Sequence, residues 1–180
     1  MLKIKDSEPA DKELIEAIRQ DDWEAFRQLY YKYHKKLFRF ALYRLHSLQI
    51  AADLVQEIFF KLWLKRDKLN PTKSIKAYLY KSLNNLIINQ SKLHSSRTTS
   101  FGNIGDHKVL NHGSDPDVKI DIQNAVNQLP KKLKIVYLLS RIEGYKYSEI
   151  AEICNISVKA VEKRMSKALD ILRKILDEYK

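Results

Sequence analysis

The placement of glycine constrains the fold of this chain more than any other feature of its sequence. Three of the four glycines in the 180 residues lie in the polar stretch HSSRTTSFGNIGDHKVLNHGSDP, residues 94–116. Glycine is unfavourable inside helices, and the chain has only 4 prolines, so the sequence on either side of this stretch has few interruptions. The pattern predicts two helical blocks, residues 10–93 and 118–180, joined by a linker at residues 94–117.

The first block carries apolar residues at helical spacing. Residues 14–18 predict a short helix, and residues 21–46 predict a longer one that Asp22 can cap. The longer helix has large apolar side chains every three or four positions, namely Trp23, Phe26, Tyr30, Tyr33, Leu37 and Phe40. Two more helices are expected over residues 50–66 and 74–93.

The second block has clear helix boundaries. Pro116 suits the first turn of a helix, which is expected to run to Leu129. The segment LPKKLK begins another helix, and Gly144 ends it. The stretch YSEIAEICNISVKAVEKRMSKALDIL, residues 147–172, predicts two helices broken by a turn at residues 154–156. The expected fold class is therefore all-α, with two small helical domains.

The last of these helices has an apolar side and a basic side. Ser157 is a natural N-cap. At about 100° per residue, one side collects Val158, Val161, Met165, Ala168, Leu169 and Leu172. The other side collects Lys159, Ala160, Lys163, Ser166 and Lys167, with Glu162 and Arg164 on the flanks. A short helix, a tight turn and a capped basic helix form the helix-turn-helix plan for binding the DNA major groove. The alternative is an ordinary surface helix with a charged outer face.

The charge of the chain agrees with a polyanionic partner. The net charge is +11, and residues 1–93 contribute 18 basic against 11 acidic groups, a net of +7. Residues 118–180 contribute 13 against 8, a net of +5. Such a balance favours nucleic acid as a partner, and a merely soluble basic protein is the alternative. The start MLKIKDSEPADKEL has no apolar leader and no run is long enough to span a membrane, so we expect a cytoplasmic protein.

The predicted third helix has two different faces. Ala51, Val55, Ile58, Phe59 and Leu62 share one face. Asp53, Gln56, Glu57, Phe60 and Leu64 share the other. Carboxylates mixed with Phe and Leu make a poor DNA surface on a basic protein and a reasonable protein-docking surface. The alternative is that Phe60 packs against another helix of the chain.

The predicted fourth helix also divides cleanly. Ile75, Leu79, Leu83, Leu86 and Ile87 are expected to face inward. Tyr78, Lys81, Asn84, Asn85, Asn89 and Lys92 are expected to face outward. An aromatic ring can stack on an unpaired base, amides can bond base edges and lysines hold phosphate, so this set suits a single DNA strand. A solvated polar face is the alternative.

Chemistry of other kinds has little support. The single cysteine excludes an internal disulfide, and the five histidines show no metal-ligand spacing with each other or with Cys154. The sequence has no glycine-rich phosphate loop, no nucleophile elbow and no carboxylate pair with a positioned base. We therefore expect no enzyme activity, no metal, no cofactor and no small-molecule substrate.

Three segments carry a family resemblance. LPKKLKIVYLLSRIEGYKYSEIAEICNISVKAVEKRMSKAL resembles region four of bacterial extracytoplasmic-function (ECF) sigma factors of the sigma-70 family. AADLVQEIFFKLW resembles their region two, with Ala52 in place of a usual acidic residue. YYKYHKKLFRFAL also resembles region two, with Lys35 where a proline is common. The resemblance implies binding to core RNA polymerase through the β′ clamp helices and the β flap, and binding to promoter DNA. It also implies an anti-sigma factor as a partner, often a membrane-bound one.

The resemblance assigns roles to particular residues. Recognition of the −35 element is implied for Lys146, Lys159, Glu162, Lys163, Arg164, Ser166 and Lys167. Recognition and melting of the −10 element, with capture of a flipped base, are implied for the outward face of the fourth helix and for the preceding loop, residues 67–74. Asn85 and Asn89 match the family's amide positions. Polymerase binding is implied for Asp53, Gln56, Glu57 and Phe60. Lys146 departs from the Ser or Thr that would cap its helix better, and can bond phosphate instead. Lys159 stands where many members have a small residue, which bears on promoter preference.

Two other functions remain open. One is a stand-alone helix-turn-helix regulator whose first block senses a ligand or dimerises, against which the outward amides and lysines of the fourth helix argue. The other is an adaptor that has lost DNA binding, against which the basic side of the last helix argues.

Overall fold

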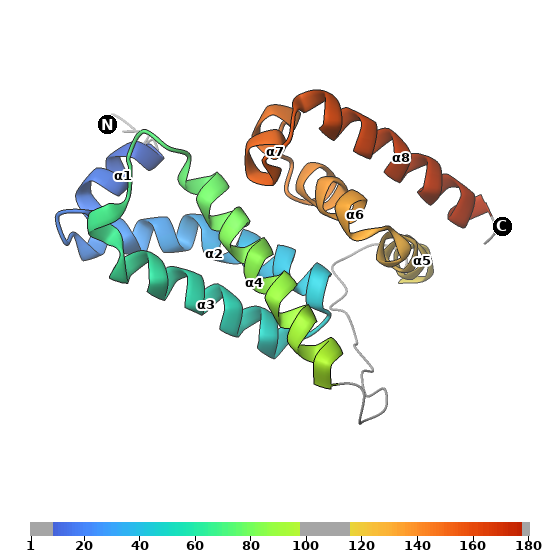
Figure 1. The fold of residues 1–180 in the computed structure, drawn as a ribbon, viewed down its shortest axis with the longest axis horizontal. Coiled ribbons are helices and arrows are strands. Elements are labelled where there is room, and N and C mark those ends of the chain that lie inside the picture. The colour runs from blue at the N-terminus through green and yellow to red at the C-terminus, as the bar shows by residue number, and fades with distance from the viewer. Residues whose placement is uncertain (1–8, 98–115, 178–180) are drawn as a thin grey trace, which may run out of the picture. The chain divides into compact units, whose positions relative to one another are not determined.

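The protein forms two compact units, residues 1–101 and 102–180 (Figure 1). The structure is a computed structural model that describes the backbone of residues 9–97 and 116–177, with side chains described for residues 9–90 and 122–177. The described residues form helices and turns and contain no strand. The expectation of an all-α fold is confirmed. No helix in the described part of the chain is long and apolar enough to cross a bilayer.

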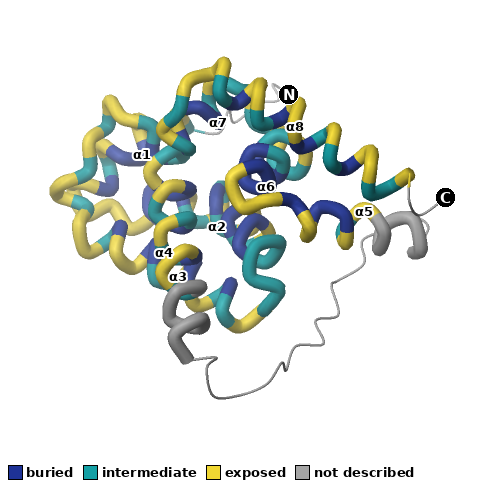
Figure 2. Tube along the Cα trace, turned by 45° about the vertical axis from the view of Figure 1, so that its right-hand side comes forward, coloured by how far each residue is buried: buried dark blue, intermediate teal, exposed yellow. Residues whose placement is uncertain are grey.

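The described residues of the first unit form a bundle of four α-helices. They are α1 (Asp11–Ile18), α2 (Trp23–Leu45), α3 (Leu48–Leu64) and α4 (Ile75–Arg97), with the short 3-10 helix η1 (Arg66–Lys68) after α3. The central helix α2 packs against the other three, and α3 also packs against α4 (Figure 1). The side chains between them are fully buried, among them Leu29, Leu37, Phe40, Ile58, Leu62, Tyr80 and Leu83 (Figure 2). The bundle therefore fixes which faces of α3 and α4 remain exposed.

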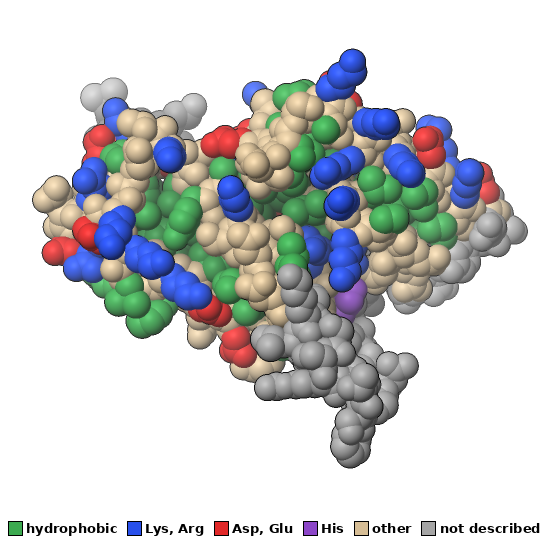
Figure 3. Space-filling view, in the orientation of Figure 1, with side chains coloured by type: hydrophobic (Ala, Val, Ile, Leu, Met, Phe, Trp, Pro, Cys, Tyr) green, Lys and Arg blue, Asp and Glu red, His purple; other side chains and the backbone are tan. Residues whose placement is uncertain are grey.

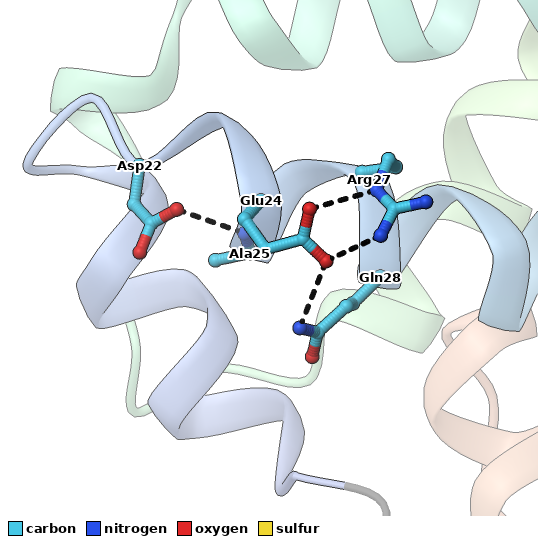
Figure 4. Close-up of polar contacts among 5 residues, drawn as sticks. All are labelled: Asp22, Glu24, Ala25, Arg27 and Gln28. Atoms are coloured by element: carbon cyan, nitrogen blue, oxygen red, sulfur yellow. Dashed lines mark hydrogen bonds and ion pairs between the residues drawn. The ribbon is translucent and has the colours of Figure 1, made fainter.

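Local capping explains where the helices of the first unit begin. The Asp22 carboxylate accepts a hydrogen bond from the Ala25 amide at 3.0 Å, which confirms the predicted cap of α2 (Figure 4). In the first turn of α2, the exposed Glu24 accepts hydrogen bonds from Arg27 and Gln28, which hold the pKa of that carboxyl below its usual value (Figure 4). Helix α3 begins two residues earlier than expected because Ser47 caps it, with its hydroxyl 3.4 Å from the Ile50 amide. Such caps are local, so the sequence can reveal them.

The described residues of the second unit form four α-helices, three of which pack around α8. They are α5 (Pro116–Gln128), α6 (Lys131–Tyr137), α7 (Tyr147–Cys154) and α8 (Val158–Asp177), with the π-helical turn η2 (Leu138–Ile142) after α6. Helix α8 packs against α5, α6 and α7. The core of this unit includes Ala125, Val136, Leu139, Ile150, Val161, Met165 and Ala168. Gly144 follows the π-helical turn with φ of +73°, in agreement with its predicted role as a helix stop.

The ends of the predicted linker differ from the structure. Helix α4 continues to Arg97, whereas its predicted end is near Leu93, and α5 begins at Pro116. Polar residues such as those after Leu93 can extend a helix that is already formed, because each added residue gains a backbone hydrogen bond. Residues 98–115 of the predicted linker lie outside the described residues.

Candidate nucleic-acid and partner interfaces

A three-residue turn joins α7 to α8. Asn155 adopts a left-handed conformation with φ of 52°, and the Ile156 amide donates to the Ala151 carbonyl at 3.0 Å. Ser157 then caps α8, because its hydroxyl accepts from the Ala160 amide at 3.1 Å. Asparagine tolerates the left-handed region better than most residues do, so the sequence of the turn favours this geometry. The helix-turn-helix pair predicted from residues 147–172 is present, and its turn and cap set the direction of α8.

Helix α8 buries one side and exposes the other. Val161, Met165, Ala168 and Leu172 are buried, and Leu169 is half-buried. The exposed residues of the predicted −35 set are Lys159, Glu162, Lys163, Ser166 and Lys167, with Arg164 half-buried. Lys and Arg side chains gather over α8 in the space-filling view (Figure 3). The structure thus places the predicted DNA-facing residues of α8 on one accessible side of the helix.

One detail of this pair differs from expectation. Val158 was expected on the apolar side, but 42 % of its surface is exposed, because it is the first residue of α8 and lies before the turn that packs on the core. Cys154, at the last position of α7, is half-buried.

The start of α7 shows how Lys146 is used. Its backbone has an extended conformation, and its amide donates to the Glu149 carboxylate at 2.9 Å. The Lys146 side chain makes no capping hydrogen bond and is exposed. Glu149 therefore stabilises the N-terminus of α7 by accepting from the Lys146 amide, and the Lys146 side chain has no capping role. This leaves the ammonium group of Lys146 at the surface near the helix start, where an anion can approach.

Helix α3 exposes the face that combines carboxylates with apolar side chains. We call Asp53, Gln56, Glu57, Phe60 and Leu64 the docking face. Phe60 and Leu64 are 63 % and 57 % exposed. The alternative that Phe60 packs against another helix is wrong for the described residues, because bundle contacts use the opposite face of α3. Both carboxylates have partners on α3 itself, because Gln49 donates to Asp53 at 3.1 Å and Lys61 pairs with Glu57. Such exposed pairs are weak and rearrange easily when a partner binds.

An aromatic cluster beside the docking face was not anticipated. Trp23 was expected to face the core, yet it is 59 % exposed, because it is the first residue of α2 and reaches past the end of the bundle. Its ring meets Trp63 of α3 edge-on, with centroids 5.1 Å apart. The guanidinium carbon of Arg66 lies 4.7 Å from the centre of the Trp63 ring, and Arg66 forms an ion pair with Asp21. Trp63 follows Phe60 by one helical turn, so the cluster extends the docking face toward α2.

Helix α4 exposes most of its predicted strand-binding set. Tyr78 is 38 % exposed, and Lys81, Asn85 and Asn89 are exposed. Asn84 is half-buried and accepts a hydrogen bond from Arg44 of α2 at 3.1 Å. Lys92 belongs to α4, but its side chain lies outside the described residues. The structure therefore groups four members of the set on an accessible face, and the fifth, Asn84, is hydrogen-bonded to Arg44.

The loop before α4 is built from short-range hydrogen bonds. Asn70 accepts from the amide and the hydroxyl of Thr72 at 2.9 and 2.7 Å, which forms an Asx-type turn. Ser74 caps α4 by accepting from the Ala77 amide at 3.1 Å. These contacts hold the loop at the N-terminal end of the same helix that carries Tyr78 and Lys81.

The described residues hold no group of three or more His, Cys, Asp or Glu side chains that could bind a metal. His34 is half-buried and stacks on Tyr30 with ring centroids 4.6 Å apart. Burial lowers the pKa of its imidazole, because the charged form loses solvation. The side chains of His94, His107 and His112 lie outside those described.

Comparison with protein families matches both units. The model of sigma-70 region 2 matches residues 29–97, and the model of sigma-70 region 4 matches residues 119–172. The ECF RNA polymerase sigma factor SigW of Bacillus subtilis (strain 168) is 25% identical over 179 residues, which cover 92% of this chain and 96% of SigW. The RNA polymerase sigma-H factor of Pseudomonas aeruginosa is 25% identical over 184 residues, which cover 92% of this chain and 93% of that protein.

Solved structures share the fold. CnrH in complex with the cytosolic domain of CnrY superposes with a TM-score of 0.73 at 22% sequence identity, covering 96% of this chain and 100% of CnrH. The sigma factor RpoE in complex with the anti-sigma factor NepR from Bartonella quintana superposes with a TM-score of 0.70 at 24% identity, covering 84% of this chain and 96% of RpoE.

Proposed function

Because this chain belongs to the extracytoplasmic-function group of the sigma-70 family, we propose that it binds core RNA polymerase and directs it to specific promoters. Residues 10–93 act as region two and residues 118–180 act as region four, joined by residues 94–117. The observation that carries the proposal is that three separate helices expose three chemically different faces. These are the basic side of α8, the docking face of α3 and the amide-rich face of α4.

The basic side of α8 recognises the −35 element. The N-terminal half of a helix-turn-helix recognition helix reaches base edges, and this half carries Lys159, Glu162 and Lys163. Lysines can contact guanine edges or phosphates, whereas a carboxylate can accept from the cytosine amino group. Lys167 lies further along the same exposed side and supplies phosphate affinity. Lys146, at the start of α7, adds a cation at the surface of the same helix pair.

The docking face of α3 binds the clamp helices of the polymerase β′ subunit. A stable protein interface has an apolar centre and a polar rim. Phe60 and Leu64 provide the apolar centre, and Asp53, Gln56 and Glu57 provide the rim. The aromatic cluster at Trp23 and Trp63 adjoins this surface and enlarges it. The second polymerase contact, to the β flap, belongs to the C-terminal unit.

The exposed face of α4 binds the non-template strand at the −10 element. Separated bases need stacking partners and hydrogen bonds to repay the loss of base pairing. Tyr78 can stack, Asn85 and Asn89 can bond base edges, and Lys81 can hold phosphate. Capture of an extruded base by this face stabilises the open promoter.

The proposal also covers regulation and location. The solved structures with this fold include a sigma factor bound to an anti-sigma factor, and we infer that an anti-sigma factor controls this chain as well. Transcription initiation takes place in the cytoplasm, and this role requires neither a cofactor nor a catalytic group from this chain.

A reconstituted transcription assay tests the proposal. The protein is added to core polymerase with a library of genomic promoter fragments, and transcript starts are mapped. We expect starts at a defined set of promoters that share −35 and −10 motifs. Binding to DNA without any support of initiation by core polymerase would instead indicate a stand-alone helix-turn-helix regulator.

A further inference from the structure

Arg44 and Asn84 form a contact between two helices that are distant in sequence. Arg44 lies in the last turn of α2, and its Nη1 donates to Asn84 Oδ1 of α4 at 3.1 Å in a partly buried position. The guanidinium carbon of Arg44 lies 5.7 Å from the centre of the Phe40 ring. Phe40 in turn meets Tyr80 edge-on with centroids 5.3 Å apart. Both rings are buried, at 1 % and 0 % exposure. The guanidinium therefore rests on a well-packed aromatic support.

This contact decides which end of the Asn84 amide faces the surface. A guanidinium has hydrogen-bond donors and no acceptor, so it can bond only the oxygen of the amide. The Asn84 oxygen is thus turned toward Arg44, and the NH2 group is left at the other end. Lys81 and Ile88, one turn before and one turn after Asn84, are both exposed, so the half-buried amide lies at an accessible part of α4.

We propose that Arg44 is a positioning residue that holds the Asn84 amide with its NH2 group toward the promoter strand. Asn84 then acts as a hydrogen-bond donor to the unpaired strand and not as an acceptor. Its partner is an acceptor atom of that strand, either on a base edge or on a phosphate. The inference rests on the proposed binding of the −10 element by α4.

The fixed orientation has a consequence for sequence selection. A free asparagine can rotate its amide and bond either a donor or an acceptor. An asparagine locked by Arg44 favours groups that accept hydrogen bonds and disfavours the exocyclic amino groups of adenine, cytosine and guanine. The lock also removes side-chain freedom before DNA binds, which lowers the entropy lost on binding.

Three substitutions separate this role from simple packing. Asn84→Asp keeps an oxygen toward Arg44 and removes the NH2 donor. Asn84→Ala removes both the oxygen and the NH2 group of the amide. Arg44→Met keeps an apolar stem over Phe40, removes the donors and leaves the amide free to rotate. Lys36→Met serves as the control, because it removes an exposed cation of α2 from the same unit and leaves the pair intact.

The test measures preference position by position. Full-length protein is assembled with core polymerase and titrated with single-stranded non-template oligonucleotides that span the −10 element of a promoter it uses. Each position carries each of the four bases in turn, and in a second series each linkage in turn is a methylphosphonate. The ratio of affinities at one position is the readout, since a general loss of packing changes all oligonucleotides alike and cancels in the ratio. In the base series the added charge of Asn84→Asp also cancels. The linkage series compares only Asn84→Ala and Arg44→Met with the wild type, because a carboxylate repels a phosphate but not a neutral methylphosphonate.

The expected result is a loss of preference confined to one site on the strand. If the acceptor is on a base, all three variants lose roughly tenfold of selectivity at one shared position, in the range of a lost base contact. At that position the preference of Asn84→Asp shifts to bases with amino groups, because a carboxylate accepts hydrogen bonds. If the acceptor is a phosphate, one methylphosphonate weakens the wild type and has no effect on Asn84→Ala and Arg44→Met. Lys36→Met keeps the wild-type ratios in both series.

Two different failures can be told apart. An Arg44→Met variant that keeps every wild-type ratio in both series would overturn the positioning role of Arg44, and the same result for Asn84→Ala would overturn the donor role of Asn84. A wild-type assembly with no preference at any base or linkage would overturn the proposed −10 recognition itself. Thermal unfolding of each variant identifies any that fail to fold. If Arg44→Met fails, Arg44→Leu, which also lacks a donor, takes its place in the test.

Discussion

Replacing Phe60 with alanine should weaken binding to core polymerase strongly while leaving the fold intact. Phe60 is 63 % exposed. A phenylalanine side chain offers about 200 Å² of surface, so roughly 125 Å² remains available for burial by a partner. At about 25 cal/mol per Å², burying this area contributes on the order of 2–3 kcal/mol beyond what alanine would retain. The dissociation constant should therefore rise roughly thirty- to a hundred-and-fifty-fold.

The effect on stability should be small, because Phe60 lies outside the bundle core. We expect the free energy of unfolding to change by less than about 0.5 kcal/mol. Leu48→Ala is the matched control: Leu48 is also on α3 and 50 % exposed, yet it lies about a third of a turn away from Phe60 around the helix.

Biolayer interferometry with immobilised core polymerase measures both variants, and urea denaturation reports their stability. The reasoning is refuted if Phe60→Ala binds within twofold of the wild type, or if Leu48→Ala loses as much affinity as Phe60→Ala does.

Substitutions at four further positions test the other surfaces and one backbone position. Asn85→Ala should reduce transcription from duplex promoters more than from promoters already mismatched at the −10 element, where strand opening costs nothing; equal loss on both templates in a run-off assay would point to a contact unrelated to opening. Lys167→Ala should weaken binding to all −35 sequences alike and lower the salt slope of binding by about one unit. Glu162→Gln should instead shift the discrimination among −35 sequences by about 1–3 kcal/mol. Binding to a −35 library at two salt concentrations measures both effects, and an unchanged ranking of sequences for Glu162→Gln would show that this carboxylate reads no base. Gly144→Ala should destabilise the second unit by about 1 kcal/mol, because φ is +73° while an added Cβ meets nothing within 4 Å. Gly144→Asn should cost less, and denaturation followed by circular dichroism would contradict this reasoning if Gly144→Ala were as stable as the wild type.

Much of the fold could be predicted because the relevant forces act between near neighbours in sequence. The spacing of apolar residues predicts which side of each helix is buried. The predicted faces of α3 and the predicted buried side of α8 beyond its first residue agree with the structure. Asp22 and Ser157 cap their helices through amides three residues away, and Gly144 takes up a positive φ that its neighbours require. These contacts do not depend on how the helices pack.

Helix ends were less predictable, since a helical wheel treats every turn as equally covered. Trp23 and Val158 have the periodicity of core residues, yet both are first residues of their helices and are exposed. Whether a side chain is covered there depends on how far the neighbouring helices extend. That length is a property of the packed unit and not of the local repeat.

The sequence alone determined that α4 carries a row of amides and lysines on its outer face. Only the tertiary structure decided that one of these amides, Asn84, meets Arg44, which lies 40 residues earlier in the chain. The pairing depends on where α2 crosses α4, and that crossing is set by the packing of Phe40 against Tyr80. Periodicity reports which side of a helix is buried, but a hydrogen bond between two helices also needs their relative position along and around their axes, which only the packed core supplies.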